Sequence, residues 1–513
     1  MGRSGKSQRT YSRLLLALAV LIVLVALIPL FFVVGYVVSI GWDQAFALIW
    51  RPRVGELLAN TGMLVVGCVG LTAVFGTGTA WLVERTTLPG RRVWNVLLVA
   101  PLAVPAFVNS FGWVSLTATV EGLAGALLII SLSYYPLVYL PVAAMLRGLD
   151  PALEETAAAL GYGPWRTFVR VVVPQLRPAL LGGALIVALH ILAEFGALQM
   201  LRFPTFTTAI YDLYGSSFNG PAANMLAGVL LLACILLLTL ELRLRGHSRY
   251  SRLGRGVART IPRRHLGRGT GPALVAVGAL TALALGVPAG SLVFWLITGS
   301  STEFPIADLV STALTSFGLG LAGATLTMAL AFPVAWLCVR RRGRLTILLE
   351  RSTYFGNAVP GIVVALALVT VSIRFARPIY QTALLLVFAY AIMFLPRAMI
   401  SVRAALDQAP PVLDDVAHAL GSGPLETLRR VTLPLIAPGL GAGMALVFLA
   451  VTTELTATLL LAPIGTRTLA TQFWSNSASI AYGAAAPYAA LMVILSAPVT
   501  LLLTRDRWRS MPV

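Results

Sequence analysis

The sequence predicts an all-α polytopic membrane protein of about 12 transmembrane helices, arranged as two parallel six-helix repeats. Of its 513 residues, 58% are apolar and only 11% are charged, and the mean hydropathy is +0.86. This composition excludes a soluble globular protein. Twelve apolar runs are long enough to cross a hydrocarbon layer about 30 Å thick. A polar stretch between the fourth and fifth runs recurs without gaps between the tenth and eleventh.

Six apolar runs fall in residues 1–242 and six in residues 270–513. Because each set is even in number, both sets enter the membrane in the same direction, and the repeats are parallel rather than inverted. The first run begins like a signal peptide but is too long and has no clear cleavage site, so we expect an uncleaved span. The predicted spans lie near 14–40, 57–83, 93–118, 123–146, 179–201, 221–242, 271–298, 310–339, 347–373, 380–402, 439–461 and 485–504.

The net charge of +19 comes from basic residues in short segments between the spans. If both termini are cytoplasmic, 32 of the 38 Lys and Arg residues lie inside and six lie outside, as expected for a multi-pass protein of a bacterial cytoplasmic membrane. Insertion in a lipid bilayer explains this distribution, so we expect the bilayer and not a nucleic acid as the partner of these basic residues. Residues 243–269 carry nine arginines without an apolar period, which predicts a basic cytoplasmic linker facing anionic lipid.

The repeated stretch has the pattern of a helical hairpin. Residues 154–178 read EETAAALGYGPWRTFVRVVVPQLRP, and residues 414–438 read DDVAHALGSGPLETLRRVTLPLIAP. At an offset of 260, Gly161 matches Gly421, and each is suited to the left-handed conformation that ends a helix. A second helix is predicted to start at the following Gly-Pro and to stop at the next proline. Such a hairpin has little apolar surface, so we expect it at the cytoplasmic face, covered by another chain.

Both copies resemble the EAA loop of the permease subunits of bacterial ATP-binding cassette (ABC) importers, in which Glu-Ala-Ala is followed by Gly and later by Leu-Pro. The first copy departs from this pattern at Thr156, and the second copy has Asp415, Val416 and Ala417, followed by His418. The resemblance implies MetI-like permease repeats whose loops, 150–178 and 407–438, dock into two copies of a cytoplasmic ABC ATPase. The coupling residues it implies are Glu155, Ala157, Ala158, Gly161, Arg166, Arg170, Asp415, Ala417, Gly421, Arg429 and Arg430.

The charged coupling residues each have a plainer alternative role, whereas the two glycines do not. Glu155 and Asp415 fall in the first turns of their helices, where the helix dipole alone favours an acid. The four arginines suit acidic groups of an ATPase or, equally, lipid phosphates. At the two glycines a side chain would penalise the turn and thicken the hairpin.

No motif for ATP hydrolysis occurs in this chain. The only lysine, Lys6, follows a glycine but lacks the earlier glycine and the flanking strand of a phosphate-binding loop. We therefore expect no cofactor and no catalytic residue here, with ATP and Mg bound by the partner ATPase.

Two carboxylates, Glu194 and Glu454, lie within predicted spans at matching positions. Glu194 is expected about 22 Å along its helix, and ionisable groups at such depth are candidates for a translocation pathway; helix packing is the alternative. His190 is four residues earlier, a spacing that suits a metal, but Ala450 takes its place in the second copy and Fe(III) prefers oxygen ligands. A histidine bonded to a neighbour is the alternative, and we assign no metal site.

The segments AEFGAL and TFTTAIY in the first half, and TELTATLLL and GTRTLAT in the second, are similar to those of ferric iron permeases. That similarity implies ferric iron as substrate, accepted from an extracytoplasmic binding protein. Tyr211 and Asp212, after the fifth span, are candidates to contact this protein; the alternative is that they are ordinary loop residues. The same machinery for thiamine, a phosphonate, a polyamine or another small solute is an alternative. A secondary transporter driven by an ion gradient also has two parallel halves, but it does not call for twin polar hairpins.

Overall fold

The computed structural model describes residues 2–150, 152–245, 263–299, 304–341, 343–356 and 359–509. These residues form helices joined by short turns, with one isolated β-bridge between Thr86 and Arg264. Most of the predicted linker, residues 246–262, lies outside the described part of the chain. The helices group into two compact units. Unit 1 comprises Met1–Ile49, Leu213–Leu231 and Phe304–Phe473, and unit 2 comprises Trp50–Asp212, Leu232–Glu303 and Trp474–Val513.

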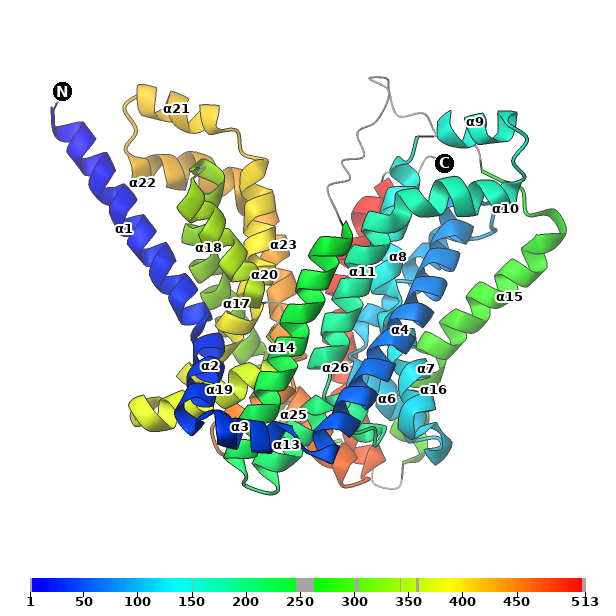
Figure 1. Ribbon diagram of the computed structural model, residues 1–513. Coiled ribbons are helices and arrows are strands. Elements are labelled where there is room, and N and C mark those ends of the chain that lie inside the picture. Colours follow the sequence, from blue (N-terminus) through cyan, green and yellow to red (C-terminus); the bar gives the residue numbers. More distant parts are fainter. Residues whose placement is uncertain are drawn as a thin grey trace. The chain divides into compact units, whose positions relative to one another are not determined.

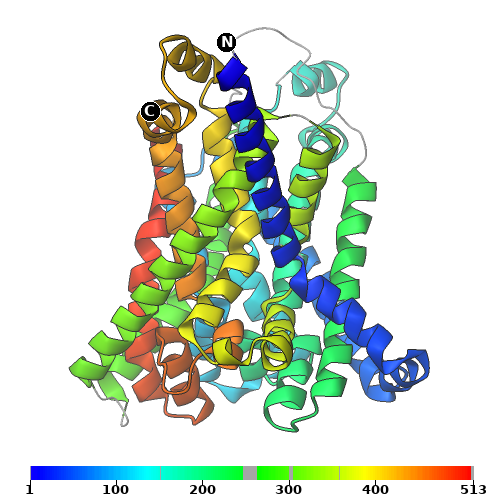
Figure 2. The ribbon, with the colours of Figure 1, turned by 90° about the vertical axis from the view of Figure 1, so that its left-hand side faces the viewer.

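Unit 1 combines most of the second half of the chain with the first span. Helix α1 lies against α17, α18 and α20, and α2 lies against α19; Figure 2 shows α1 in dark blue, crossing the yellow-green helices of this unit. Ala19 and Val23 of α1 share a buried core with Ala324 and Leu386. The helices of unit 1 are α1 (Gly2–Ala26), α2 (Ile28–Ile40), α3 (Trp42–Ile49), α17 (Ile306–Arg340), α18 (Arg344–Phe355), α19 (Gly361–Phe375), α20 (Ala383–Asp407), α21 (Pro411–Ala419), α22 (Pro424–Thr427), α23 (Leu433–Thr452) and α24 (Thr456–Leu461).

Unit 2 combines most of the first half with the seventh span. Helix α16 lies so close to α6 that a Cβ atom on Gly112 would come within 2.6 Å of the Cα atom of Pro288. The helices of unit 2 are α4 (Pro52–Arg85), α5 (Arg91–Leu97), α6 (Ala106–Val114), α7 (Gly122–Tyr134), α8 (Pro136–Gly148), α9 (Ala152–Ala159), α10 (Pro164–Thr167), α11 (Val173–Ala193), α12 (Gly196–Met200), α15 (Thr270–Thr281), α16 (Val287–Thr298) and α26 (Tyr482–Arg509). Three further helices, α13 (Phe206–Gly215), α14 (Gly220–Arg245) and α25 (Leu469–Ala478), extend from one unit into the other.

The two compact units are therefore not the two halves of the sequence. The span that opens each half packs in the unit built mainly from the other half. Apolar periodicity reports that a helix is buried but not which helix covers it, so this exchange is invisible in the sequence.

Each predicted span corresponds to helical structure, although not every helix has the full length of a span. Among the described residues, seven helices are long and apolar enough to cross a membrane, three bent pairs pass the same test when each pair is taken together, and two further apolar helices, Gly361–Phe375 and Tyr482–Pro498, are shorter. The prediction of an all-α polytopic membrane protein is thus confirmed, and seven to ten of its spans meet the length and composition test in the described residues.

The third span of each repeat is interrupted, which the predicted ranges 93–118 and 347–373 do not show. In the first repeat the chain bends by 92° before α6, and Pro105 immediately precedes that helix. In the second repeat Pro360 immediately precedes α19. A proline cannot donate the backbone hydrogen bond that would continue a helix from the preceding segment, so these two equivalent prolines start new helices.

Candidate functional site: two hairpins and two capped helix breaks

The first repeated stretch forms a hairpin at the end of unit 2 where α4 ends and α11 begins (Figure 1). Helix α9 ends at a turn in which Gly161 has a φ of +80°. There the backbone N–H of Tyr162 donates to the Ala157 carbonyl at 3.0 Å, and that of Gly161 donates to the Ala158 carbonyl at 2.9 Å. These bonds satisfy carbonyls that the helix end would leave without partners.

The second stretch repeats this geometry at the corresponding end of unit 1, as α21 and α22 (Figure 1). Gly421 has a φ of +91°. The N–H of Ser422 donates to the Ala417 carbonyl at 3.0 Å, and that of Gly421 donates to the His418 carbonyl at 3.0 Å. The predicted helix, glycine turn and second helix are confirmed in both copies.

The second limb of each hairpin does not stop at the next proline, so that prediction is wrong. Instead α10 and α22 continue through a turn of π-helix, Phe168–Val172 and Leu428–Thr432, into α11 and α23. The N–H of Val173 donates to the carbonyl of Phe168, five residues back. Such a wide turn accommodates the missing N–H of the proline that follows it.

The coupling residues that the resemblance implies occupy matching environments in the two hairpins. Ala157 and Ala417 are buried beneath the turns, whereas the other predicted members, glycines included, are exposed: Glu155, Ala158, Gly161, Arg166, Arg170, Asp415, Gly421, Arg429 and Arg430. The Arg166 guanidinium lies 4.8 Å from the centre of the Tyr162 ring, and Arg430 pairs with Glu426 at 2.8 Å. The Asp150 carboxylate accepts the N–H of Ala152 at 3.0 Å, so Asp150 rather than Glu155 caps the start of α9.

The acid that ties each hairpin to its own unit is the neighbour of the predicted one. Glu154 pairs with Arg85 at 3.1 Å, and Asp414 pairs with Arg340 at 2.9 Å. Sequence reasoning missed these pairs, although a signal exists. Arg85 and Arg340 each end the second span of a repeat, 255 residues apart, and the two acids are 260 residues apart.

Each hairpin also has two large apolar side chains, at equivalent positions, that are more than 70% exposed. Leu160 and Trp165 are 72% and 75% exposed, and Leu420 and Leu425 are 82% and 74% exposed. They lie on the turn and at the start of the second limb. Apolar side chains gathered on an otherwise polar projection are typical of a surface that a partner covers.

Glu194 and Glu454 sit at breaks in their helices, which corrects the prediction of a continuous fifth span at 179–201. Helix α11 ends at Ala193, and Glu194 itself has an extended backbone, with φ −73° and ψ 126°. Its Oε1 accepts the N–H of Ala197 at 3.0 Å; Oε1 of Glu454 accepts the N–H of Ala457, also at 3.0 Å. Both carboxylates therefore cap the first turn of a short helix, α12 or α24.

His190 and Glu194 do not share a helical face as predicted, because the helix ends between them. They share a neighbour instead: the Tyr134 hydroxyl donates to Oε2 of Glu194 at 2.5 Å, and the Tyr134 ring lies edge-on to the His190 ring, with centroids 5.4 Å apart. His190 Nδ1 also lies 2.8 Å from the Ile186 carbonyl. Within the described ranges, no three or more His, Cys, Asp or Glu residues gather as metal ligands would.

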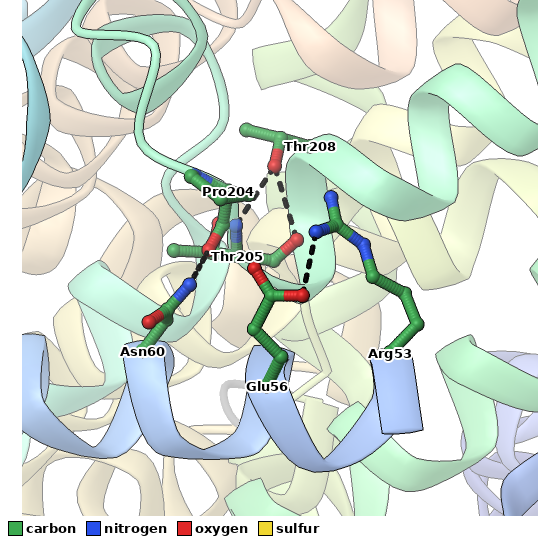
Figure 3. A network of polar contacts seen from close by, with 6 residues as sticks. All are labelled: Arg53, Glu56, Asn60, Pro204, Thr205 and Thr208. Carbon is green, nitrogen blue, oxygen red and sulfur yellow. Dashed lines mark hydrogen bonds and ion pairs between the residues drawn. The ribbon is translucent and has the colours of Figure 1, made fainter. Parts of the chain in front are cut away.

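A polar network holds the segment after the fifth span against the start of α4 (Figure 3). Asn60 donates to the Pro204 carbonyl at 3.2 Å, and Arg53 pairs with Glu56 at 2.8 Å. The N–H of Thr205 donates to the Thr208 hydroxyl at 2.9 Å, which fixes the start of α13.

Tyr211 and Asp212, on α13, lie beyond this network. Burial raises the pKa of the Asp212 carboxyl, and the hydrogen bond from Gln199 and the charge of Arg53 oppose that rise. Burial also raises the pKa of the Tyr211 hydroxyl. Both residues lie within helix α13 rather than in a free loop: the Tyr211 ring packs on that of Phe195, with centroids 4.5 Å apart, and the Asp212 side chain is exposed.

Comparison with known proteins agrees with this geometry. The family described as "Binding-protein-dependent transport system inner membrane component" matches residues 3–244 and 323–505. The chain is 40% identical to a Fe(3+)-transport system permease protein of Haemophilus influenzae over 94% of its own length and 97% of that protein. It is 22% identical to a ferric transport system permease protein of Actinobacillus pleuropneumoniae, over 90% of its length and 72% of that protein. A sulfate transport system permease protein of Escherichia coli is 31% identical over 42% of this chain and 85% of that protein. With two matched repeats, a matching hairpin in each and seven to ten apolar helices or bent pairs able to cross a membrane in the described residues, the chain belongs to the family of inner membrane components of binding-protein-dependent transport systems.

Proposed function

We propose that this chain is the permease of an ATP-driven importer for ferric iron. The observation that carries the proposal is the pair of equivalent hairpins, each with the same turn and the same pattern of exposure. The choice of ferric iron is supported by the relative from Haemophilus influenzae, because its similarity extends over nearly the whole chain rather than over one repeat. The sulfate permease of Escherichia coli matches 42% of the chain.

Two cytoplasmic ATPase subunits bind the hairpins in this proposal, one on each. The apolar pairs Leu160 and Trp165, and Leu420 and Leu425, enter the ATPase surface, and the exposed arginines of the second limbs meet its acidic groups. ATP and Mg bind on the ATPase. Movement of the hairpins when the ATPases close then changes access to the pathway, because the ATPases contact the two states of the permease differently.

The same proposal fixes the orientation in the inner membrane. Both termini and both hairpins are cytoplasmic, since the basic residues concentrate on that side. The extracytoplasmic binding protein delivers its ligand to the opposite face, where α13 and Asp212 lie. Glu194 and Glu454 line the pathway of the cation. The helix breaks that they cap are non-helical backbone, which membrane proteins tolerate where it is buried in protein or lines a water-filled path.

Truncating the apolar pair of one hairpin is expected to weaken ATPase binding to that hairpin. For Leu160→Ala with Trp165→Ala, or Leu420→Ala with Leu425→Ala, we expect about a 30-fold loss of affinity, because removing a buried anchor from an interface costs about 2 kcal/mol. Titration of the purified ATPase against the permease in nanodiscs measures this. Val66→Ala is the matched control, since Val66 is 74% exposed but lies within α4, away from the hairpin. Equal affinities for all variants would argue against these docking positions.

The proposal as a whole is tested in proteoliposomes that contain this chain, its ATPase and its binding protein. We expect uptake of radiolabelled ferric iron that requires ATP inside and the binding protein outside, and that excess sulfate, thiamine or phosphonate does not reduce. Uptake that persists without ATP while an ion gradient is intact would contradict the importer. ATP-dependent uptake of another solute, with none of ferric iron, would contradict the substrate alone.

A further inference from the structure

One ion pair in each unit joins the hairpin to the end of a long helix. Arg85 is the last residue of α4, and its Nη2 lies 3.1 Å from Oε1 of Glu154 on the hairpin. Arg340 is the last residue of α17, and its Nη2 lies 2.9 Å from Oδ2 of Asp414. The two pairs are equivalent in the repeats, so a requirement on both units, rather than local chance, accounts for them.

These pairs are shielded from solvent. The exposed fractions of the side chains are 8% and 28% for Arg85 and Glu154, and 12% and 18% for Arg340 and Asp414. Moreover, Nε of Arg85 and Nε of Arg340 are buried without a hydrogen-bond partner in the part of the chain that the structure describes. A buried ion pair with unsatisfied donors is often no more stable than an apolar pair of the same volume. Stability alone therefore does not account for two such pairs.

The surroundings of the two pairs differ. Around Arg340, Nη1 donates to the Ala409 carbonyl at 3.1 Å, and the guanidinium lies 5.3 Å from the centre of the Trp336 ring. The Thr432 hydroxyl also donates to Asp414, at 2.8 Å.

Around Arg85 the support comes from the chain after the linker. The N–H of Arg264 donates to the Arg85 carbonyl at 2.9 Å, and the Arg264 carbonyl accepts the N–H of Thr87 at 3.1 Å. Different neighbours thus hold the same link in the two units, so the feature that the repeats share is the link itself.

The helices at the other end of the link are central to their units. Helix α4 contacts α7, α8 and α11, and α17 contacts α20 and α23. Each spans the length of its unit, with 34 residues in α4 and 35 in α17. A displacement of α4 or α17 therefore acts directly on the helices that pack against it.

We propose that Arg85 and Arg340 are positioning residues that transmit movement of each hairpin to the long second span of its own unit. This inference rests on the proposed function, since it assumes that an ATPase moves the hairpins. Without this ion pair, the ATPase still binds the exposed face of the hairpin and still hydrolyses ATP. The spans no longer follow, so hydrolysis continues while transport falls.

The test measures ferric iron taken up per ATP hydrolysed by the complete complex in proteoliposomes. For Arg85→Met with Arg340→Met we expect this ratio to fall about 2- to 30-fold, the range found when residues that couple distant sites are changed. The four-fold variant that adds Glu154→Leu and Asp414→Leu also removes the two acids that have lost their arginines, and it restores apolar packing. We expect its thermal stability to recover while the ratio stays low.

Arg147→Met is the matched control. Arg147 pairs with the buried Glu84 at 3.2 Å, beside Arg85 but without reaching the hairpin. Its loss breaks an ion pair at the same helix end, and the uptake per ATP should stay that of the unaltered protein.

An unchanged uptake of ferric iron per ATP in the Arg85→Met, Arg340→Met variant would overturn the inference. Recovery of this ratio in the four-fold variant would overturn it too, because the ion pairs would then have only a structural role. Failure of the proposed function is distinguishable from both, since the unaltered complex would then show no ATP-dependent uptake.

Discussion

Gly161→Val combined with Gly421→Val is expected to abolish ATP-driven uptake while the chain still inserts in the membrane. Both glycines have a left-handed backbone, at φ values of +80° and +91°, which costs an L-residue about 1–2 kcal/mol. No atom lies within 4 Å of a Cβ built on either glycine. The chain itself therefore has room for the side chain, and the damage comes from strain in the turn and from bulk on the docking surface. ATP-dependent uptake by proteoliposomes, at matched amounts of inserted protein, measures the effect.

Two control variants test whether uptake is lost because of the turn conformation or because of the loss of any glycine in the hairpin. Gly423 has a φ of −72° and ψ of 164°, a conformation that valine adopts readily, so Gly163→Val with Gly423→Val should retain most of the uptake. Gly161→Asn with Gly421→Asn should retain more than the valine pair, because asparagine tolerates the left-handed region. Full uptake by the valine pair at 161 and 421 would contradict a docking role for these turns.

Glu194→Gln combined with Glu454→Gln is expected to slow uptake of a cation without unfolding the protein. The glutamine Oε1 atom can still accept the N–H of Ala197 or Ala457, so the caps on α12 and α24 remain while the charge is lost. At position 194 the amide nitrogen takes the place of Oε2 and donates to the Tyr134 hydroxyl instead of accepting from it. We expect uptake to fall at least about tenfold, which corresponds to about 1.4 kcal/mol less stabilisation of the cation in its passage. Initial rates of ferric iron uptake, with ATPase activity measured in parallel, test this.

The variant Glu194→Ala with Glu454→Ala removes the caps as well as the charge. It should lower the free energy of unfolding by about 1 kcal/mol for each cap, so its melting temperature should fall where that of the glutamine pair does not. Tyr134→Phe is a further control, because it removes a donor to Glu194 alone; Ala389 stands at the matching position of the second repeat. Uptake at the normal rate in the glutamine pair would leave both carboxylates with a capping role only.

The elements that depend on local chemistry were predictable from the sequence. Glycine at a helix end, followed by Gly-Pro, determined the hairpins, and the left-handed φ of Gly161 and Gly421 follows from it. Pro105 and Pro360 also start α6 and α19 for a local reason, although the predicted ranges 93–118 and 347–373 treated each span as continuous. The number of spans followed from hydropathy.

The features that depend on tertiary contacts could not be predicted from the sequence. Glu194 lies in a continuous apolar run, and nothing in that run shows that the helix ends at Ala193; the break is stabilised by Tyr134, sixty residues earlier. The link between Arg85 and Glu154 joins residues on different helices, and a charge at a span end looks the same whether it faces lipid phosphates or a carboxylate. The exchange of first spans between the units has the same cause, since periodicity does not name a partner.

The central claim is that two separate ATPase copies hold the two hairpins. It is tested most directly by crosslinking from Leu160→Cys and, in a second protein, from Leu420→Cys, in a background with Cys68, Cys234 and Cys338 replaced by serine. We predict that each cysteine crosslinks to the ATPase and that the protein with both cysteines captures two copies per chain. An assembled, actively transporting complex in which neither position crosslinks, or in which one copy suffices for both, would contradict the account.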